Sequence, residues 1–318
     1  MSKWKLVTGG AGFIGSHLVE ALLDQGERVR VLDDFSTGLR SNLSERHPCL
    51  EIIEGDLADE NSVRRAMRDV AVVFHLGALA SVQKSVEEPK VTHRVCASGT
   101  LEVLDAARWA GVRRVVYAAS SSAYGLPCGD LQAETEPAQP LSPYAAAKLA
   151  GELYAQAFAA TYGLETVRLR FFNIFGPRQR ADSPYSGVIA LFLAAMTQGR
   201  RPTIFGDGLQ SRDFTYVTDV VQALRQAATV PGISGKVYNV GTGRGVNLLE
   251  LVAAINQLLG TELTPKHESP RPGDVRHSRA DIRLAQAELG YQPEVSFPQG
   301  LAKTLEWYRA AELTVAGV

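Results

Sequence analysis

The chain has 318 residues, of which 45% are hydrophobic, and its formal net charge is −1 at pH 7. This length can bury a sizeable core in one large or two moderate domains, and the near-zero charge argues against nucleic acid or an acidic membrane as a partner. No run of about 18 apolar residues indicates a membrane span. Cys49, Cys96 and Cys128 are scattered without metal-ligand spacing, and the six histidines form no ligand pair. We therefore expect a reduced, cytoplasmic protein without a metal site.

A glycine-rich turn, Thr8–Gly15, follows a strand predicted at Lys5–Thr8 and opens a helix. Three of its glycines, Gly9, Gly12 and Gly15, suit a tight turn, a close approach to a pyrophosphate and close packing of the helix on the sheet. The start of the helix then presents free N–H groups and a partial positive charge to phosphates. The expected cofactor contacts in this segment are Gly9, Gly12, Phe13, Ile14 and Gly15.

A second strand is predicted at Arg28–Asp33, and it ends in a carboxylate. Asp33 can accept hydrogen bonds from both hydroxyls of an adenosine ribose and would repel a 2′-phosphate, which favours NAD over NADP. A glycine triplet alone is a common turn. The combination of strand, glycines, helix and acid predicts a dinucleotide site.

Strands and helices continue to alternate along the chain. Further strands are predicted at Glu51–Glu54, Val72–Leu76, Arg114–Ala119, Thr166–Phe171 and Val237–Val240, and the clearest helices at Val91–Ala110 and Tyr144–Tyr162. This alternation predicts an α/β fold with a doubly wound parallel Rossmann sheet. Frequent Gly and Pro breaks in the second half predict a smaller mixed α/β domain for the substrate. We expect the nucleotide-binding domain at 1–173 and 214–243, and the smaller domain at 174–213 and 244–318.

Tyr144 and Lys148 are four residues apart, so they share one face of the predicted helix. A nearby ammonium favours a phenolate, and we expect Lys148 to lower the pKa of Tyr144 toward the working range. Ser120 is the first residue after the strand Arg114–Ala119, at the sheet edge where ligands bind in α/β proteins. Its hydroxyl can hydrogen-bond a substrate oxygen. A serine-rich surface turn is the alternative interpretation of this segment.

Several ordered segments accompany these motifs, namely Gly55–Leu57, Phe74–Ala78, Ser120–Gly125, Arg170–Asn173, Gly206–Gly208, Ser211–Phe214 and Arg271–Val275. With them, nearly the whole chain resembles the extended short-chain dehydrogenase/reductase family, and more narrowly its UDP-hexose 4-epimerases. The resemblance implies NAD as the cofactor and a UDP-sugar as the substrate. It places Asp56 at the adenine amino group, Leu57 at the adenine ring and Phe171 near the nicotinamide. The implied cofactor site is completed by Leu76, Ala78, Tyr144 and Lys148.

The same resemblance assigns the substrate side. It implies that Asn173 and Arg212 bind the UDP diphosphate, because an arginine fork presents several charged donors. Arg271 would add a second cation, and Asp274 would bind the uridine ribose. The implied substrate residues are Ser120, Ser122, Asn173, Thr203, Phe205, Arg212, Arg271, Asp274 and Ser278, with Thr203 and Phe205 flanking the uracil.

The implied reaction is NAD-dependent inversion at C4 of a UDP-hexose through a transient 4-keto sugar. Tyr144 removes the C4-hydroxyl proton, Ser120 bridges the same oxygen, and Lys148 holds the cofactor ribose. The small Ser278 leaves room for an N-acetyl group, so UDP-GlcNAc and UDP-GalNAc are expected beside UDP-glucose and UDP-galactose. The family also implies a homodimer through the helices at Val91–Ala110 and Tyr144–Tyr162, with contact candidates at Leu101, Leu104, Leu149, Leu153 and Ala157.

Two features of the sequence bear on the alternatives. Cys96 stands where many relatives have an asparagine that hydrogen-bonds near the cofactor, so this contact is expected to differ. Ser121 and Ser122 replace the Asp and Glu of the nucleotide-sugar 4,6-dehydratases, which argues against that chemistry and against the UDP-glucuronate decarboxylases.

Two alternatives stay open. One is a UDP-glucuronate 4-epimerase, in which Arg178 or Arg180 would meet the carboxylate. The other belongs to a different class, a non-catalytic NAD-binding regulatory or scaffold protein. The presence of Ser120, Tyr144 and Lys148 argues against the second.

Overall fold

The computed structural model describes residues 3–126, 129, 131–181, 187–270 and 275–315, and the side chains among them up to residue 310. Cys128 and two predicted substrate residues, Arg271 and Asp274, lie outside the described residues. The main sheet has seven strands in the order β11-β6-β5-β4-β1-β2-β3, and every neighbouring pair is parallel. The strands are β1 (Trp4–Thr8), β2 (Val29–Asp33), β3 (Leu50–Glu54), β4 (Val70–His75), β5 (Arg114–Ser120), β6 (Glu165–Phe171) and β11 (Lys236–Val240). The predicted parallel Rossmann sheet is confirmed.

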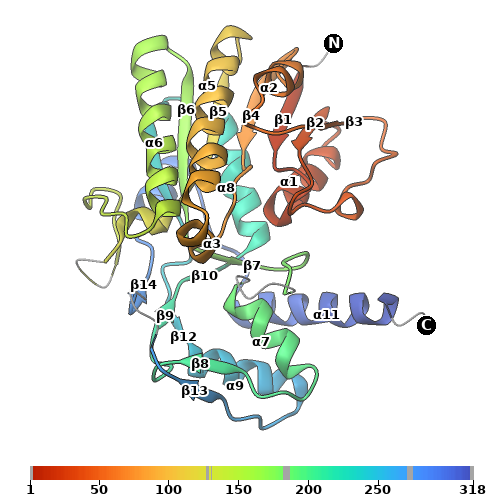
Figure 1. The fold of residues 1–318 in the computed structure, drawn as a ribbon, viewed down its shortest axis with the longest axis vertical. Helices are drawn as coiled ribbons and strands as arrows, with labels where there is room; N and C mark the ends of the chain where they lie inside the picture. Colours follow the sequence, from red (N-terminus) through yellow and green to blue (C-terminus); the bar gives the residue numbers. More distant parts are fainter. Residues whose placement is uncertain (1–2, 127–128, 130, 182–186, 271–274, 316–318) are drawn as a thin grey trace.

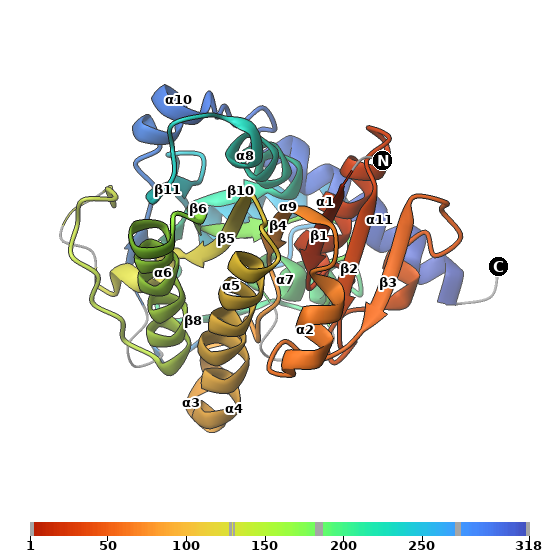
Figure 2. The ribbon, with the colours of Figure 1, turned by 90° about the horizontal axis from the view of Figure 1, so that it is seen from above.

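Helices cover both faces of this sheet, as seen from above in Figure 2. The elements on one face are α1 (Phe13–Leu23) and α8 (Val217–Thr229), and those on the other are α2 (Glu60–Ala66), α5 (Gly99–Trp109) and α6 (Pro143–Tyr162). Successive strand residues point to opposite faces, so Val7 joins one apolar cluster with Leu22 and Leu224, while Leu6 joins another with Val103 and Phe158. Both clusters are buried, which is why the parallel strands are apolar along nearly their whole length.

The helix predicted at Val91–Ala110 is not a uniform α-helix. After α3 (Val82–Glu87), the chain forms α4 (Pro89–His93), a π-helical turn η2 (Arg94–Ser98) and then α5. Single π turns are rare and often occur at functional sites. This one carries Cys96, whose side chain is buried.

Local sequence fixes both ends of α6. The Ser142 hydroxyl accepts a hydrogen bond from the backbone N–H of Ala145, and Pro143 occupies the first turn, where its missing N–H costs nothing. Gly163 ends the helix in a left-handed conformation with φ of 69°. Tyr144 therefore lies in the first turn, near the carboxyl edge of the sheet.

The second half of the chain also supplies smaller sheets and four more helices. Most of these elements lie below the large sheet in Figure 1, but the helix at Arg283–Leu289 packs against β11 and α8. The strands are β7 (Asn173–Phe175), β8 (Thr203–Phe205), β9 (Ser211–Arg212), β10 (Phe214–Tyr216), β12 (Val246–Asn247), β13 (Lys266–Glu268) and β14 (His277–Ser278). The helices are α7 (Val188–Met196), α9 (Leu248–Leu259), α10 (Arg283–Leu289) and α11 (Phe297–Val315). Phe192, Leu251 and Leu301 belong to a third apolar cluster here. None of the described helices has the length and apolar character needed to cross a bilayer.

Candidate active site

The strand order reverses between β1 and β4. From β1 the chain builds outward to β2 and β3, and it then returns to place β4 on the other side of β1. In open α/β sheets, ligands bind at the carboxyl ends of the strands beside such a reversal. Thr8, His75, Ser120 and Phe171 end four neighbouring strands at this edge.

The glycine turn after β1 has the geometry of a phosphate cradle. Gly9 has φ of +67°, and a Cβ there would come within 2.7 Å of the Gly77 Cα. A Cβ at Gly15 would come within 2.1 Å of the Gly9 carbonyl oxygen, so Gly15 packs on the turn itself. Gly12 precedes α1, whose first turn has no side-chain cap and no acidic residue. The N–H groups of this first turn are not capped by a side chain, so they suit an anion such as a pyrophosphate.

Asp33 lies at the end of β2 with both carboxylate oxygens engaged. Oδ2 accepts from the Ala11 N–H at 2.9 Å, and Oδ1 accepts from the Phe35 N–H at 2.9 Å. Burial raises the pKa of Asp33 above its ordinary value, and these two N–H groups oppose the shift. Each oxygen keeps a second lone pair, so the carboxylate can still accept ribose hydroxyls.

The residues expected at the adenine lie beside helix α5 and its π turn. Asp56 accepts from the Ala58 N–H at 2.8 Å and forms a 2.7 Å ion pair with Arg94. Leu57 is buried, and its Cδ1 is 2.5 Å from where a Cβ at Gly77 would lie. Leu76 and Ala78 are partly buried in the loop after β4, and Phe171 is buried at the end of β6.

His75 is a buried residue of this edge for which no role was predicted. Thr8 Oγ1 accepts from the Gly77 N–H at 3.1 Å and lies 2.7 Å from His75 Nδ1. His75 Nε2 lies 2.9 Å from Thr100 Oγ1, which itself donates to the Cys96 carbonyl at 2.7 Å. These partners place the imidazole proton on Nε2. Burial lowers the pKa of His75 to about 3, so the neutral ring joins β1, β4 and α5.

The structure brings Ser120, Tyr144 and Lys148 together. Ser120 opens a 3₁₀ turn, η3 (Ser121–Tyr124), and its Oγ lies 2.8 Å from Ser122 Oγ. The Ser120 hydroxyl also hydrogen-bonds the Tyr144 phenol. The Lys148 side chain is buried, with Nζ 4.6 Å from the centroid of the Tyr117 ring.

The expectation that Lys148 lowers the pKa of Tyr144 is wrong. Burial raises the pKa of Tyr144 above its ordinary value, and the hydrogen bond from Ser120 opposes that rise. The Lys148 ammonium lies against the Tyr117 ring, and burial lowers its own pKa. Desolvation of the phenolate is therefore the main cause of the shift in the Tyr144 pKa.

Backbone pairing brings the predicted substrate residues to the catalytic edge. Ser120 lies opposite Phe171 across β5 and β6, and two residues later the Asn173 N–H donates to the Asp213 carbonyl at 3.0 Å. Arg212, the residue before Asp213, lies opposite Ser278 across β9 and β14. Thr203 and Phe205 lie on β8, in a separate small sheet with β13. A 2.7 Å hydrogen bond from Gln210 Nε2 to the Phe205 carbonyl ties β8 to the segment before β9.

Asp213 is a second buried residue that the sequence did not single out as structural. Its Oδ1 accepts from the Thr242 N–H at 2.8 Å, and its Oδ2 accepts from the Gly243 and Ala280 N–H groups at 2.9 and 3.1 Å. These bonds tie the Arg212 strand to the turn after β11 and to the segment after Ser278.

Arg178 and Arg180 lie beside the nucleotide-binding half. Arg178 forms a 2.7 Å ion pair with Glu20 of α1. Arg180 donates to the Thr37 carbonyl, in the loop after β2. The structure therefore places these arginines beside α1 and the loop that follows Asp33, which weakens the argument for a glucuronate carboxylate bound by them.

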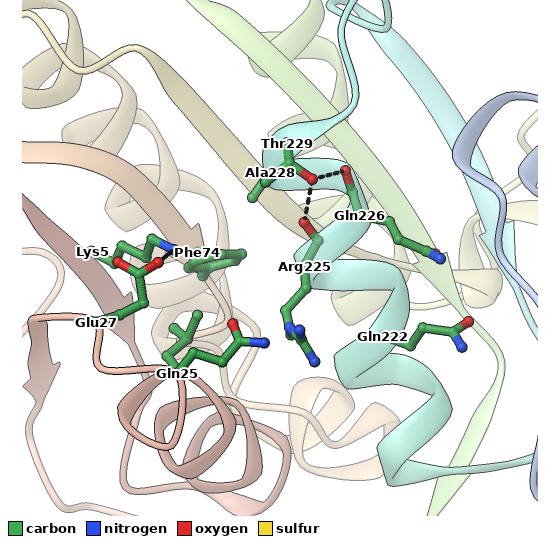
Figure 3. A pocket seen from close by; sticks show the side chains of 10 residues that line it. Lys5, Gln25, Glu27, Phe74, Gln222, Arg225, Gln226, Ala228 and Thr229 are labelled. Carbon is green, nitrogen blue, oxygen red and sulfur yellow. Dashed lines mark hydrogen bonds and ion pairs between the residues drawn. The ribbon is translucent and has the colours of Figure 1, made fainter.

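A cavity of about 310 Å³ lies between α1, the start of β1 and α8, at the amino edge of the large sheet. Lys5, Phe74 and Arg225 are among its lining residues (Figure 3). It lies at the opposite edge from Ser120 and is not part of the candidate site. Among the described residues, no three His, Cys, Asp or Glu side chains gather in a metal-holding group.

Comparisons with known proteins agree with this geometry. Residues 5–241 match the NAD dependent epimerase/dehydratase family. A UDP-glucose 4-epimerase of Mycolicibacterium smegmatis is 42% identical over 96% of this chain and 98% of that protein. A solved UDP-N-acetylglucosamine 4-epimerase from Methanobrevibacter ruminantium, in complex with UDP-N-acetylmuramic acid, has a TM-score of 0.93 and 38% identity, covering 98% of this chain and 99% of that one.

A third comparison concerns the cofactor. The UDP-glucose 4-epimerase of Thermus thermophilus, solved in complex with NAD, is 38% identical with a TM-score of 0.88, covering 97% of this chain and 99% of that one. The predicted cofactor, NAD, is confirmed by the family and by this neighbour. The chain belongs to the NAD dependent epimerase/dehydratase family.

Proposed function

We propose that the protein interconverts C4 epimers of UDP-hexoses, using tightly bound NAD. The observation that carries this proposal is the cluster of Ser120, Tyr144 and Lys148 at the carboxyl edge of the sheet, beside the glycine turn after β1 and the Asp33 carboxylate that accepts from the Ala11 N–H of that turn. The related dehydratases need acid–base carboxylates after the catalytic hydroxyl residue. Here the two following residues are serines, which supports simple inversion at C4.

NAD, when bound, accepts a hydride from C4 and later returns it, and its oxidised ring carries a positive charge. In the NAD-loaded enzyme, where the positive nicotinamide ring would favour the phenolate, Tyr144 as a phenolate would take the proton of the C4 hydroxyl and give it back after the sugar has turned its other face. Ser120, hydrogen-bonded to Tyr144 and 2.8 Å from Ser122, holds the same sugar oxygen. Lys148, four residues after Tyr144, binds the cofactor ribose. Arg212 and Asn173 hold the diphosphate while the 4-keto sugar rotates.

The range of sugars that the enzyme accepts should depend on Ser278. We infer that UDP-GlcNAc and UDP-GalNAc interconvert beside UDP-glucose and UDP-galactose, because a serine at this position leaves space at the C2 substituent. The ion pair of Arg178 with Glu20 makes the glucuronate alternative less favoured. A non-catalytic NAD-binding role is disfavoured by the presence of all three catalytic side chains.

We also propose a homodimer that acts in the cytoplasm. The outer faces of α5 and α6 expose large apolar side chains, with Leu153 57% exposed and Trp109 75% exposed. Ala157 is exposed as well, and Leu101 and Leu149 are partly buried. Leu104, in contrast, is 1% exposed and belongs to the core of its own subunit, so it is removed from the contact candidates.

One experiment tests the reaction. The NAD-loaded enzyme is incubated separately with UDP-glucose, UDP-GlcNAc and UDP-glucuronate, and the C4 epimers are resolved by chromatography. We expect epimers from the first two and little from the third. Epimerisation of UDP-glucuronate alone would support the alternative sugar. No epimer from any sugar, together with no reduction of the bound cofactor on adding sugar, would favour the non-catalytic role.

A further inference from the structure

Glu152 and Arg170 form a buried ion pair that the proposed reaction does not use. The side chain of Glu152 is 1% exposed and that of Arg170 is 7% exposed. Arg170 Nε lies 3.0 Å from Oε1 and 3.1 Å from Oε2, and Nη2 lies 2.9 Å from Oε2. Desolvating two charges costs several kcal/mol per ion, and apolar side chains of similar size often stabilise a core as well. Stability alone is therefore a weak explanation of this pair.

The position of Glu152 on α6 relates it to the catalytic residues. Tyr144, Lys148 and Glu152 follow one another at intervals of four residues, so they form one stripe along the helix. The groups that interact electrostatically with Lys148 are His75, Cys96, the Tyr117 ring and Glu152. Burial lowers the pKa of His75 and raises the pKa values of Cys96 and Tyr117, so these three side chains are uncharged near neutral pH. Glu152 is thus the anion of this set.

Glu152 acts on Lys148 without bonding to it. Among the described ion pairs, the Glu152 carboxylate pairs with Arg170 and not with Lys148. Glu152 also receives the field of Arg168, which donates to the Gln156 side chain at 3.0 Å. Burial lowers the pKa of Lys148, and Cys96 and then Glu152 oppose that shift. Burial raises the pKa of the Cys96 thiol, so Glu152 is the one of these two groups that carries a charge near neutral pH. The fork of Arg170 keeps the carboxylate turned toward β6, so the ammonium stays available to the cofactor ribose and to Tyr144.

Arg170 also touches the serine side of the site. It is the Cα partner of Ala119, the residue before Ser120. Its guanidinium lies 4.6 Å from the centroid of the Tyr124 ring, and Tyr124 ends the turn that Ser120 opens. The Tyr124 hydroxyl donates to Asn239 Oδ1 at 2.7 Å, at the neighbouring strand β11. One guanidinium therefore connects the helix of Tyr144 and Lys148 with the turn of Ser120.

We propose that Glu152 is a positioning residue of the active site, which keeps Lys148 in its ammonium form, and that Arg170 holds Glu152 where it can do so without sequestering that ammonium. The proposal rests on the proposed catalytic role of Lys148. It predicts that the charge of Glu152, rather than its volume, sets the alkaline limit of activity. If the pair were purely structural, removing its charges would change the melting temperature and leave the pH profile of kcat unchanged.

The test uses NAD-loaded enzyme and Glu152→Gln, which keeps the size of the side chain and removes its charge. Removing the anion lowers the pKa of Lys148, so the alkaline limb of the kcat profile should move to lower pH by about one unit. At a pH on the alkaline limb of the unmodified enzyme, kcat of Glu152→Gln should be about tenfold lower. KM for the UDP-sugar should change little. Glu152→Asp keeps the charge and should leave the limb in place while lowering the melting temperature.

Matched controls separate charge from folding. Glu165→Gln removes a carboxylate on β6 that pairs at 2.8 Å with the buried Arg114 on β5, at the amino ends of these two strands. It should leave the pH profile unchanged. The double variant Glu152→Gln/Arg170→Gln replaces the ion pair with two amides, so it should recover thermal stability while the limb stays shifted. This variant decides the question if Glu152→Gln alone does not fold.

A second readout needs no sugar. The ¹³Cε resonance of Lys148, assigned with Lys148→Arg, is titrated by NMR in each NAD-loaded variant. Its midpoint should fall by about one pH unit in Glu152→Gln and in the double variant, and stay unchanged in Glu165→Gln. A midpoint within a few tenths of a unit of the unmodified enzyme in the folded Glu152 variants would overturn the proposal. A shifted midpoint without epimerase activity on any sugar would instead count against the proposed function.

Discussion

Ser278 on β14 lies directly opposite Arg212 on β9. The Ser278 carbonyl accepts from the Asp213 N–H at 2.8 Å, so the backbone holds this strand in place. The Ser278 side chain takes no part in that bond. It can therefore be changed at a fixed distance from the arginine expected to bind the diphosphate.

We predict that Ser278→Tyr selectively removes activity on UDP-GlcNAc and UDP-GalNAc. A tyrosine ring would fill the space of the acetamido group and exclude it sterically, whereas the plain hexoses should still fit. The measurement is kcat/KM for both pairs of sugars, with Ser278→Ala as the control that keeps the position small. An equal loss on both pairs in Ser278→Tyr would show that the gate lies elsewhere.

Tyr144→Phe should reduce kcat by about 10²–10⁴-fold, because it removes the proton carrier and leaves the ring in place. The fold and the retention of NAD should not change. Circular dichroism and the cofactor content of the purified variant check both points. Activity within a few-fold of the unmodified enzyme would refute the assignment of Tyr144.

Asp33→Ala should weaken NAD binding and narrow its advantage over NADP. The change removes the acceptor for the ribose hydroxyls and the charge that repels a 2′-phosphate. It also leaves the Ala11 and Phe35 N–H groups without their acceptor, so part of the loss of NAD affinity would come from rearrangement of these loops. Asp34→Ala, next along the same loop, is the control. Titration of both cofactors by fluorescence gives the ratio, and equal affinities in the unmodified protein would contradict the ribose argument.

The free energy of unfolding should decrease as the pH is lowered, over a range set partly by His75. Its pKa is lowered from 6.5 to about 3 by burial, so below about pH 6.5 the unfolded chain binds a proton that the folded chain does not. Each such proton reduces the free energy of unfolding by about 1.4 kcal/mol per pH unit until the folded pKa is reached.

His75→Gln should flatten that dependence, since an amide can bond to Thr8 and Thr100 without titrating. Urea unfolding between about pH 7 and about pH 4 measures the slope in each protein. His267→Gln, at an exposed position, should keep the slope of the unmodified protein. If His75→Gln keeps it as well, the neutral buried imidazole is not its source.

Leu153→Glu should convert the proposed homodimer to monomers. The residue is 57% exposed on the outer face of α6, where a charge cannot be buried in an apolar interface without a large penalty. Light scattering gives the mass of both proteins, and Leu249→Glu on α9, also an exposed leucine, is the control. A monomeric unmodified protein at micromolar concentration would contradict the dimer.

The large sheet was predictable because its strands are short apolar runs that alternate with helices. β1, β5 and β6 begin or end within one residue of their expected positions. The two-residue strands β9, β12 and β14 were not predictable, because pairing with distant segments rather than local propensity forms them. The π turn at Arg94–Ser98 also escaped prediction, since apolar periodicity does not distinguish one wider turn within a helix.

The candidate site was also predictable only in part. Ser120, Tyr144 and Lys148 were predictable from their spacing and from the strand edge, and the structure brings them together. The roles of the site residues and the domain boundaries stay predictions. The pairing of Glu152 with Arg170 was not visible, because it joins residues 18 apart on a helix and a strand. The direction of the shift in the Tyr144 pKa was predicted wrongly, since spacing does not report how far a phenol is removed from water.

The contact between Gly9 and Gly77 has a consequence for cofactor selection. A Cβ at either glycine would collide with its surroundings, within 2.7 Å of the Gly77 Cα in one case and 2.5 Å of Leu57 Cδ1 in the other. The turn expected to bind the pyrophosphate thus packs directly on the loop that carries Leu76 and Ala78. Because this contact is between two backbones, a side chain at either glycine should push the two segments apart and so change the length of dinucleotide that the site accepts.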